Sequence, residues 1–596
     1  MDLHFSSAEP TPEEKAAIDA ATSAIAPEDL RPRRTHLLPT LHAIQNHIGW
    51  ISEGALNYAS RKLEIPPADA FGVASFYGLL STRPQPPVVA HLCDDLACKL
   101  KGADRLCAEF EKLKGPEGTS SDQRTTWHRT PCLGMCEHAP AVLIRTAGPN
   151  PSDRALASAE VSDIFGALHG MHIAPPRLII PQFGQPGLNL LRRVGNVDPE
   201  SLDDYRASGG FQALRRAFEI GPPGIIREVT AAKLVGRGGA AFPTGQKWNA
   251  VSVHPQPRYL VCNADESEPG TFKDRVILEG DPYALVEAMT IAAHATGCEH
   301  GYLYIRGEYS LAARRMEHAI RQCRSRGFLG ENILGHEMKF DIEVRIGAGA
   351  YICGEETALL NSIEGYRGEP RNKPPFPTQV GLFGRPTVIN NVETLVNVLP
   401  ILLEGGEAFS RVGSGQSTGT KLFCVSGHVM SPGVYEANFG ITLRQLLDLA
   451  GGVSGTGRLQ AVLIGGAAGG FVRPRDLDMP LTFEGARDAG VTLGSAVVMP
   501  FDDTVDLRQI LVRIAAFFRD ESCGQCVPCR VGTVRQEELL QRLALRKPLG
   551  SRATEMVLLK EVGQAMRDAS ICGLGQTASS AVESAFARFD LFPEKA

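Results

Sequence analysis

Two sets of cysteines have spacings that suit iron–sulfur clusters. The first set pairs Cys93-x4-Cys98 with Cys132-x3-Cys136, and thirty-three residues separate the two pairs. Two loops that each offer two thiolates can converge on two irons, so this set predicts a [2Fe–2S] cluster. A zinc site with four cysteine ligands is the alternative, but zinc ribbons favour paired C-x2-C turns.

The second set lies near the C-terminus. Cys523, Cys526 and Cys529 form a C-x2-C-x2-C run, and Cys572 follows at a distance. Three thiolates from one tight loop and a remote fourth predict a [4Fe–4S] cluster. Zinc is again the alternative, although this layout is not that of a ribbon. We interpret the scattered cysteines as small buried apolar residues; they are Cys107, Cys262, Cys298, Cys323, Cys353 and Cys424.

A glycine-rich stretch could bind phosphate. Residues 235–248 read V-G-R-G-G-A-A-F-P-T-G-Q-K-W, and such a run leaves backbone N–H groups open to close approach. Residues 259–262 read as a short buried strand, and the Asn, Asp and Glu cluster of residues 263–268 follows it. Open α/β sheets bind ligands at such strand ends. Alone, the glycine run also fits an ordinary tight turn.

Composition narrows the class of protein. The chain has 596 residues, 43% of them apolar, and a net charge of -6, which argues against general nucleic-acid binding. It contains no run of eighteen apolar residues, and its N-terminus lacks a basic stretch followed by an apolar core. We therefore predict a cytoplasmic protein that binds no nucleic acid and does not contact a membrane directly.

The elements around these motifs suggest several domains. Residues 11–83 have helical spacing of apolar side chains, with one helix expected from Pro66 to about Leu80. Residues 88–172 read as a small α/β unit. A proline- and glycine-rich connector follows, with one helix expected over 201–218. Residues 420–500 read as a small β-rich domain, and the last hundred residues as helical.

The N-terminal third resembles a known family. F-G-V-A-S-F-Y (71–77), H-L-C-D-D-L-A-C (91–98) and P-C-L-G-M-C-E-H-A-P (131–140) are similar to the small flavoprotein-associated subunit of respiratory complex I. That resemblance implies a helical lead and a thioredoxin-like domain with a [2Fe–2S] cluster. All four ligand positions are kept.

The chain from about residue 223 to its end resembles the large, FMN- and NADH-binding subunit of the same module. Besides the first glycine loop, the match includes residues 347–357, 370–377 and 386–394. Two positions depart from the family. Ala241 stands where glycine is usual, and Ala250 stands where some members have an aromatic residue near the nucleotide.

The resemblance implies two groups of nucleotide-binding residues. Those expected to contact FMN are Gly236, Arg237, Gly238, Lys247, Asn263, Asp265, Tyr351, Gly354, Glu355, Asn390 and Asn391. Those expected to meet NADH are Phe242, Glu266, Glu268, Glu356, Lys373 and Phe376. The chemistry agrees, because hydride transfer needs stacked, oriented rings and no protein acid or base. Carboxylates would also repel a 2′-phosphate, which favours NAD(H) over NADP(H).

Together these observations predict a multidomain α/β protein. We expect a helical lead (1–83), a thioredoxin-like [2Fe–2S] domain (84–172), a connector (173–222) and a Rossmann-like FMN/NADH domain (223–415). A ubiquitin-like β-grasp insert (416–505), with a packing role only, and a helical [4Fe–4S] domain (506–596) complete the chain. Flavin exchanges hydride electron pairs for single electrons, so electrons would pass between NADH, FMN, the [4Fe–4S] cluster and a partner. The [2Fe–2S] cluster is expected on the other side of the flavin.

The fusion of the two subunits in one chain points to a parent complex. Single-chain fusions resemble the diaphorase subunits of soluble NAD-linked formate dehydrogenases and NAD-reducing hydrogenases. The N-terminal cysteine set is often incomplete in the hydrogenase version and is complete here. The resemblance thus implies the β subunit of a molybdenum- or tungsten-dependent formate dehydrogenase, partnered by a catalytic α subunit carrying further iron–sulfur clusters. The alternatives are a hydrogenase diaphorase, a complex I input module, and a non-enzymatic scaffold.

Overall fold

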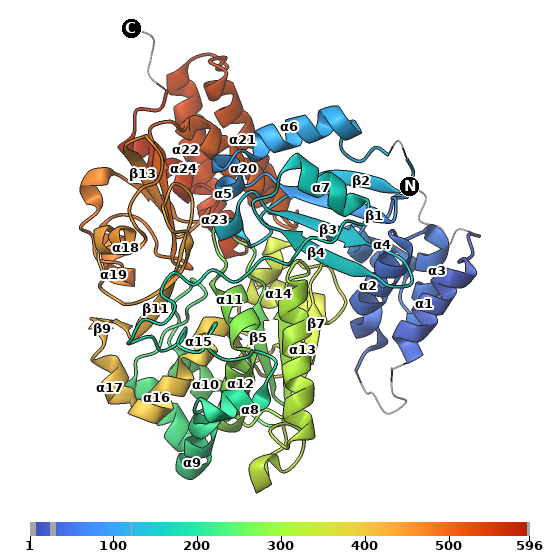
Figure 1. Cartoon of the computed structure of the whole chain (residues 1–596), viewed down its shortest axis with the longest axis vertical. Helices are drawn as coiled ribbons and strands as arrows, with labels where there is room; N and C mark the ends of the chain where they lie inside the picture. The colour runs from blue at the N-terminus through green and yellow to red at the C-terminus, as the bar shows by residue number, and fades with distance from the viewer. Residues whose placement is uncertain (1–6, 24, 26–30, 121, 593–596) are drawn as a thin grey trace.

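The computed structural model describes residues 7–23, 25, 31–120 and 122–592 (Figure 1). Blue N-terminal helices and a small sheet lie on one side, the green and yellow α/β domain lies below, and the orange β-rich domain lies opposite. The red C-terminal helices lie at the top. The multidomain α/β architecture predicted from the sequence is confirmed.

Four helices form the lead, namely α1 (Pro12–Ser23), α2 (Leu37–Ile48), α3 (Glu53–Leu63) and α4 (Pro67–Ala74). The last ends at Ala74 and not near Leu80 as expected. The reason lies in the following segment, where Gly78 N donates to Gly349 O (3.1 Å) and Leu79 N to Ala348 O (2.9 Å). These residues bond to residues 347–357, a second glycine-rich segment that we call the second glycine loop, so their amides are not available to continue the helix.

The thioredoxin-like domain has a four-stranded sheet in the order β2-β1-β3-β4. Its strands are β1 (Val88–Cys93), β2 (Thr125–Thr130), β3 (Val142–Thr146) and β4 (Ser152–Leu156). Helices α6 (Ala103–Lys114) and α7 (Val161–Leu168) share one core with this sheet, in which Phe110 packs edge-on against Trp127. A separate apolar cluster contains Cys93 and Cys98. The core formed by these two helices and the sheet contains none of the four cysteines of the first set, so their loops are available to contact other domains.

The connector contains two helices where one was expected. These are α8 (Leu202–Ala207) and α9 (Gln212–Ala231). Gly209, with a φ of 89°, separates them, because a left-handed residue interrupts a helix. Helix α9 runs through a kink at Gly221, so the domain boundary predicted at 222/223 falls inside it.

The flavin domain is built on a parallel sheet in the order β7-β6-β5-β8. Its strands are β5 (Tyr259–Ala264), β6 (His300–Ile305), β7 (Asp341–Ile346) and β8 (Thr387–Asn391). The main helices are α10 (Thr244–Ser252), α11 (Lys273–Gly280), α12 (Pro282–Thr296), α13 (Ser310–Ser325), α14 (Glu356–Ile363) and α15 (Val392–Val396). Because β5 and β8 are paired and parallel, Asn263 and Asn391 end at the same sheet edge.

The β-grasp domain has a five-stranded sheet in the order β12-β11-β15-β13-β14. Its strands are β11 (Thr420–Val425), β12 (Gly433–Asn438), β13 (Leu459–Ile464), β14 (Gly470–Val472) and β15 (Val497–Asp502). Helix α18 (Leu443–Leu449) packs on this sheet and begins with a capping box at Thr442. The buried carboxylate of Glu436 accepts hydrogen bonds from the amides of Asn189, Leu190 and Leu191. The connector is therefore fixed to this domain.

The C-terminal part is helical, as predicted. It comprises α20 (Leu507–Glu521), α21 (Val527–Ala544), α22 (Arg552–Ala569), α23 (Gly573–Thr577) and α24 (Ser580–Arg588). In Figure 1 the red helices α20 and α21 lie beside the thioredoxin-like domain. Among the described residues, no helix combines the length and apolar character needed to cross a bilayer.

Candidate functional site

The first cysteine set comes together at one edge of the thioredoxin-like domain. Strand β1 ends on Cys93, Cys98 lies in α5 (Leu96–Leu100), and Cys132 and Cys136 lie after β2; all four are buried. The sulfurs of Cys132 and Cys136 are 3.4 Å apart. Hydrogen bonds from Cys136 and Cys93 hold the pKa of Cys132 well below its usual value. Four buried thiols on two facing loops fit the predicted [2Fe–2S] cluster.

Two arginines of the flavin domain hold this cysteine loop. Arg306 donates to Cys132 O (2.6 Å) and Arg275 donates to Gly134 O (2.9 Å). Arg306 also pairs with Glu308 at 2.7 Å. A Cβ atom at Gly134 would lie 2.1 Å from the Tyr309 hydroxyl, so only glycine allows this close approach. The loop is thus clamped directly against the flavin domain.

The second cysteine set surrounds the start of α21. Cys523 and Cys526 are half-buried, and Cys529 and Cys572 are buried. Cys572 immediately precedes α23, where a Cβ at Gly575 would lie 2.9 Å from the Cβ of Cys529. The segment that begins with Cys572 therefore packs against Cys529, which fits a [4Fe–4S] cluster on these four cysteines. All fourteen cysteines are among the described residues, and no disulfide joins them.

The cluster domain also touches the second glycine loop. The carboxylate of Glu521, two residues before Cys523, accepts a hydrogen bond from Tyr351 N at 2.8 Å. The Tyr351 ring lies 5.1 Å from that of Phe517 on α20. Burial raises the pKa of Glu521 to about 7. Tyr351, an expected FMN contact, is therefore held by the domain that carries the second cysteine set.

The first glycine loop closes on itself before α10. Gly236 N donates to Phe242 O at 2.9 Å, and Thr244 N donates to Leu234 O at 2.8 Å. A Cβ at Gly238 would lie 3.2 Å from the Cβ of Asn391, so glycine allows the loop to approach the end of β8. This geometry forms a narrow backbone cradle of the kind that accepts phosphate.

Ala241, the departure from the family pattern, has a φ of 52°. A left-handed conformation costs an L-residue about 1–2 kcal/mol. Glycine avoids this cost, but its greater freedom in the unfolded chain cancels about 0.5–1 kcal/mol of the gain. We therefore expect Ala241→Gly to stabilise the loop by up to about 1 kcal/mol. The half-life of bound flavin on dilution should lengthen. Faster flavin loss from the glycine variant would show that the methyl group contributes to binding.

The asparagine and aspartate residues expected at FMN lie at the ends of the paired strands β5 and β8, and Asp265 N donates to Asn263 Oδ1 at 3.1 Å. Asn263 Nδ2 donates to Gly354 O (2.8 Å), and Asn390 Oδ1 accepts from Trp248 Nε1 (2.8 Å). A Cβ at Gly354 would lie 3.2 Å from Asp265 O. The Oδ2 atom of Asp265 is buried and lacks a hydrogen-bond partner, and burial raises the pKa of this side chain. An orphaned carboxyl oxygen at this edge fits a bound ligand with hydrogen-bond donors.

Arg237 is fully buried beside the cradle. Its Nη2 donates to Thr418 O at 2.6 Å and its guanidinium lies 4.6 Å from the Phe439 ring centre. Its Nε and Nη1 atoms have no hydrogen-bond partner. The side chain is therefore directed at the β-grasp domain, and its proposed role at phosphate is that of a nearby positive charge.

Residues expected at FMN, Lys247 and Glu355, lie beside residues expected at NADH, namely Phe242, Glu356 and Lys373. Lys247 Nζ donates to Ile389 O (3.0 Å) and lies 5.8 Å from the Phe242 ring centre. Lys373 Nζ lies 2.8 Å from Glu355 and 3.2 Å from Glu356. Glu355 also accepts from the amides at the start of α14. The rings expected to stack are open to ligand: Phe242 is 51% and Phe376 52% exposed.

Two expected NADH carboxylates already have protein partners. Glu266 accepts from Asp274 N and Arg275 N at the start of α11, and from the Tyr309 hydroxyl. Glu268 accepts from Ala468 N (3.0 Å) and from the Ser495 hydroxyl (3.2 Å). The β-grasp domain therefore does more than pack, because it holds a residue that we place at the nucleotide.

We expect Glu268→Gln to raise KM for NADH several-fold and to flatten its pH dependence between about pH 6 and 8. Burial raises the pKa of Glu268 from 4.5 to about 7, so its carboxylate gains charge across that interval. A raised folded-state pKa also lowers the free energy of unfolding as pH rises from about 4.5 to 7, and glutamine removes this loss. Measurement of KM against pH tests this; an unchanged KM would remove Glu268 from the site.

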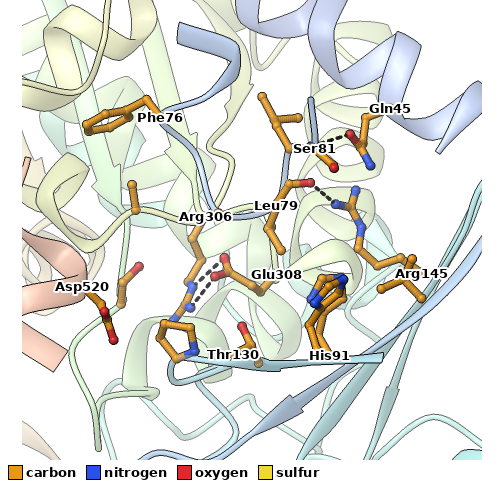
Figure 2. Close-up of a pocket in the computed structure, with 18 of the residues that line it drawn as sticks. Gln45, Phe76, Leu79, Ser81, His91, Thr130, Arg145, Arg306, Glu308 and Asp520 are labelled. Carbon is orange, nitrogen blue, oxygen red and sulfur yellow. Dashed lines mark hydrogen bonds and ion pairs between the residues drawn. The ribbon is translucent and has the colours of Figure 1, made fainter. Parts of the chain in front are cut away.

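A cavity of about 580 Å³ is lined by the helical lead, the thioredoxin-like domain, the flavin domain and the C-terminal helical domain (Figure 2). Cys132 and Cys523 both line it, so the two cysteine loops face a common space. Figure 2 shows Arg306 paired with Glu308, and Arg145 bonded to Leu79 O. Burial lowers the pKa of His91 to about 3, so this imidazole is neutral. Of the expected nucleotide contacts, Tyr351 lines this cavity.

Some residues of the site were missed in the sequence. The Thr394 hydroxyl accepts a hydrogen bond from Arg237 N at 2.8 Å. Trp248 donates a hydrogen bond to Asn390, and Glu521 accepts one from Tyr351 N. Thr394 and Trp248 stand inside motifs already singled out, so their positions were available. Glu521 directly precedes a cysteine motif, but nothing in the sequence pairs it with residue 351.

Family descriptions match nearly all of these domains. They are the Nuo51 FMN-binding domain (residues 229–400), the thioredoxin-like [2Fe-2S] ferredoxin (23–158), the SLBB domain (421–496) and the NADH-ubiquinone oxidoreductase-F iron-sulfur binding region (509–593). These matches establish FMN, NAD(H), one [2Fe–2S] cluster and one [4Fe–4S] cluster as the cofactors of this chain.

Similar proteins include NADH-quinone oxidoreductase and hydrogenase subunits. An F-type NADH-quinone oxidoreductase protein of Rhizobium meliloti is 44% identical over 67% of this chain and 95% of its own length. The NADP-reducing hydrogenase protein HndC of Solidesulfovibrio fructosivorans is 43% identical over 67% of this chain and 81% of its length. A chain of the H2-reduced NAD+-reducing [NiFe]-hydrogenase covers 94% of this chain, and 92% of that chain is covered, at 33% identity and a TM-score of 0.79. The chain belongs to the family of F-type NADH-quinone oxidoreductase proteins, and carries the thioredoxin-like [2Fe–2S] domain at its N-terminal side.

Proposed function

We propose that this chain is the diaphorase, or β, subunit of a molybdenum- or tungsten-dependent, NAD-linked formate dehydrogenase. In that complex it would reduce NAD+ with electrons that originate from formate. The observation that carries the proposal is the complete N-terminal cysteine set: Cys93, Cys98, Cys132 and Cys136 are all present, buried and grouped. The resemblance implies that hydrogenase diaphorases often lack part of this set.

The chain's residues would bind and orient the nucleotide. Phe242 and Phe376 offer exposed flat surfaces for stacking against the nicotinamide or adenine ring. Glu356 would accept hydrogen bonds from ribose hydroxyls and repel a 2′-phosphate, which favours NAD(H). Bound FMN supplies the exchange between hydride and single electrons. The hydrogenase relative from Solidesulfovibrio is named as NADP-reducing, so the nucleotide preference is a proposal for this chain alone.

We further propose that electrons leave through the second cysteine set. Cys523 and Cys526 are the least buried of the eight cysteines. Helix α21 continues outward from them with Val527, Val531 and Val534 exposed at helical spacing. An exposed apolar stripe beside a redox site suits a partner subunit that carries its own iron–sulfur cluster. The catalytic α subunit of the formate dehydrogenase is that partner in our proposal.

A second candidate is the diaphorase subunit of an NAD-reducing hydrogenase. The likeness to the NAD+-reducing [NiFe]-hydrogenase favours it, because that likeness spans 94% of the chain. A complex I input module is supported by the NADH-quinone oxidoreductase relatives, but those cover only about two thirds of this chain.

Elemental analysis of the natively purified complex separates these candidates. Molybdenum or tungsten together with iron, and formate-dependent reduction of NAD+, are the expected results. Nickel would instead favour the hydrogenase. Iron alone, without formate oxidation, would overturn the formate dehydrogenase proposal and leave an NADH-oxidising input module as the better assignment.

A further inference from the structure

The β-grasp domain meets the flavin domain directly behind the glycine cradle. Arg237 of the cradle extends to Thr418 and Phe439, at the edge of the β-grasp domain. Leu422 N, on strand β11, donates to Glu393 Oε1 at 2.9 Å. Glu393 follows Asn391, and Asn391 is the residue whose Cβ approaches Gly238. The two domains therefore share an interface within a few residues of the expected flavin phosphate.

A chain of buried charges crosses this interface. Lys421 on β11 is fully buried, and its Nζ lies 2.5 Å from Glu393 Oε2. The same Glu393 oxygen lies 3.1 Å from Lys273 Nζ, which in turn lies 2.7 Å from Asp274 Oδ1. Asn391 closes the chain: its Nδ2 donates to Asp274 Oδ2 (2.5 Å), and its Oδ1 accepts from Lys273 Nζ (3.3 Å). Each of these side chains is therefore held by an ion pair or hydrogen bond to the next, from Lys421 to Asn391.

The charges of this group do not cancel. Lys421, Lys273 and the buried Arg237 are cationic, whereas only Glu393 and Asp274 are anionic. Burial and the Asp274 carboxylate raise the pKa of the neighbouring Glu266, whose carboxyl group accepts hydrogen bonds from Asp274 N and Arg275 N. Burial lowers the pKa of Lys421 to about 8, so at pH 7 this lysine keeps its proton. An excess of one buried positive charge next to a phosphate cradle attracts an anion.

We propose that Lys421 of the β-grasp domain is a positioning residue for flavin binding, which fixes Asn391 through Glu393 and Lys273 and supplies the charge that balances the flavin phosphate. The β-grasp domain is thus part of the flavin site, although its lysine does not contact the cradle. This inference rests on the proposed placement of the phosphate at the loop of Gly236 and Gly238.

The test compares FMN with riboflavin, which lacks the phosphate. The holoprotein is freed of flavin, and dissociation constants for both compounds are measured at pH 7 for wild type and Lys421→Met. Loss of one nearby charge should weaken FMN binding about tenfold or more. Riboflavin binding should change less than twofold. A merely structural role for Lys421 would weaken both compounds alike.

Two further variants complete the design. Lys421→Gln removes the charge but can still donate to Glu393, so it replaces Lys421→Met if that variant does not fold, with the same expected loss. The double variant Lys421→Met/Glu393→Gln removes one charge of each sign and should raise the ratio of FMN to riboflavin affinity above that of Lys421→Met, because the net charge is restored although the link to Asn391 is not. An unchanged ratio in folded Lys421→Met and Lys421→Gln, or equal weakening of both compounds, would overturn the proposal.

Gly238→Ala distinguishes failure of this inference from failure of the phosphate placement. Its new Cβ would crowd Asn391 at 3.2 Å and should selectively weaken FMN binding. If Gly238→Ala has this effect and the Lys421 variants do not, the role of Lys421 is wrong. If Gly238→Ala leaves FMN affinity unchanged, the phosphate placement is wrong, and the inference is overturned with it. Iron content and cluster absorption confirm folding of each variant.

Discussion

Replacing Cys526 with serine is expected to stop electron delivery to the partner while flavin stays bound. Cys526 stands at the start of α21 and is one of three thiols in the loop that we assign to the [4Fe–4S] cluster. The expected flavin contacts lie in another domain, on β5, β8 and the glycine loops. Loss of a ligand should exceed the 10–100-fold effect typical of outer-sphere residues, so partner-linked turnover should fall by about 100-fold or more.

The measurement pairs two activities with flavin content. NADH-dependent reduction of ferricyanide, which can take electrons at the flavin, should remain partly intact in Cys526→Ser, and partner-linked activity should be lost. Cys107→Ser is the matched control, because Cys107 is buried in the thioredoxin-like core and belongs to neither cysteine set. If Cys526→Ser also lost its flavin, the separation of the flavin and cluster domains would be wrong.

The second large effect is expected at Arg306. This guanidinium is 2% exposed, pairs with Glu308 and bonds Glu266 O and Cys132 O, each at 2.6 Å. Arg306→Met leaves the Glu308 carboxylate without its partner and Cys132 O without a donor, while Glu266 O keeps only the Tyr309 hydroxyl at 3.4 Å. Breaking such a buried pair costs about 3–5 kcal/mol. We expect the thioredoxin-like domain to lose its hold on the flavin domain, and its cluster to become labile.

Urea unfolding followed by [2Fe–2S] absorption measures this effect. The cluster signal of Arg306→Met should be lost at a much lower urea concentration than in wild type. Arg324→Met is the control: Arg324 and Asp341 form an exposed pair, both 44% exposed, and its loss should cost less than about 1 kcal/mol. If the cluster of Arg306→Met resisted urea as well as that of the control, the contacts of Arg306 would not be what holds the cysteine loop in place.

Features that depend on short-range spacing of residues could be predicted from the sequence. The cysteine sets, the glycine-rich stretches and the short strand before Asn263 all have local signatures, and the resemblance covers them. Helix bounds were less predictable. The sequence around Leu80 retains helical spacing, but the chain there bonds to Gly349 and Ala348, more than 250 residues away, and this contact ends α4.

Long-range polar contacts could not be predicted. The family resemblance implied that Glu266 and Glu268 meet the nucleotide. The structure shows that Glu266 caps α11 and that Glu268 is held by Ala468 and Ser495 of the β-grasp domain. Lys421 lies in an apolar strand pattern, which gives no indication that it pairs with Glu393. Such partners are set by domain packing and not by local spacing.

The most direct test of this account is an anaerobic titration of the purified chain with NADH, followed by flavin absorbance and electron paramagnetic resonance. We predict that NADH bleaches the flavin and that the signal of a reduced [4Fe–4S] cluster then appears without any other reductant. In Cys526→Ser the flavin should bleach and that signal should be absent. If NADH left the wild-type flavin and the [4Fe–4S] cluster oxidised, while dithionite reduced both, this chain would not be an entry or exit point for NAD-linked electrons.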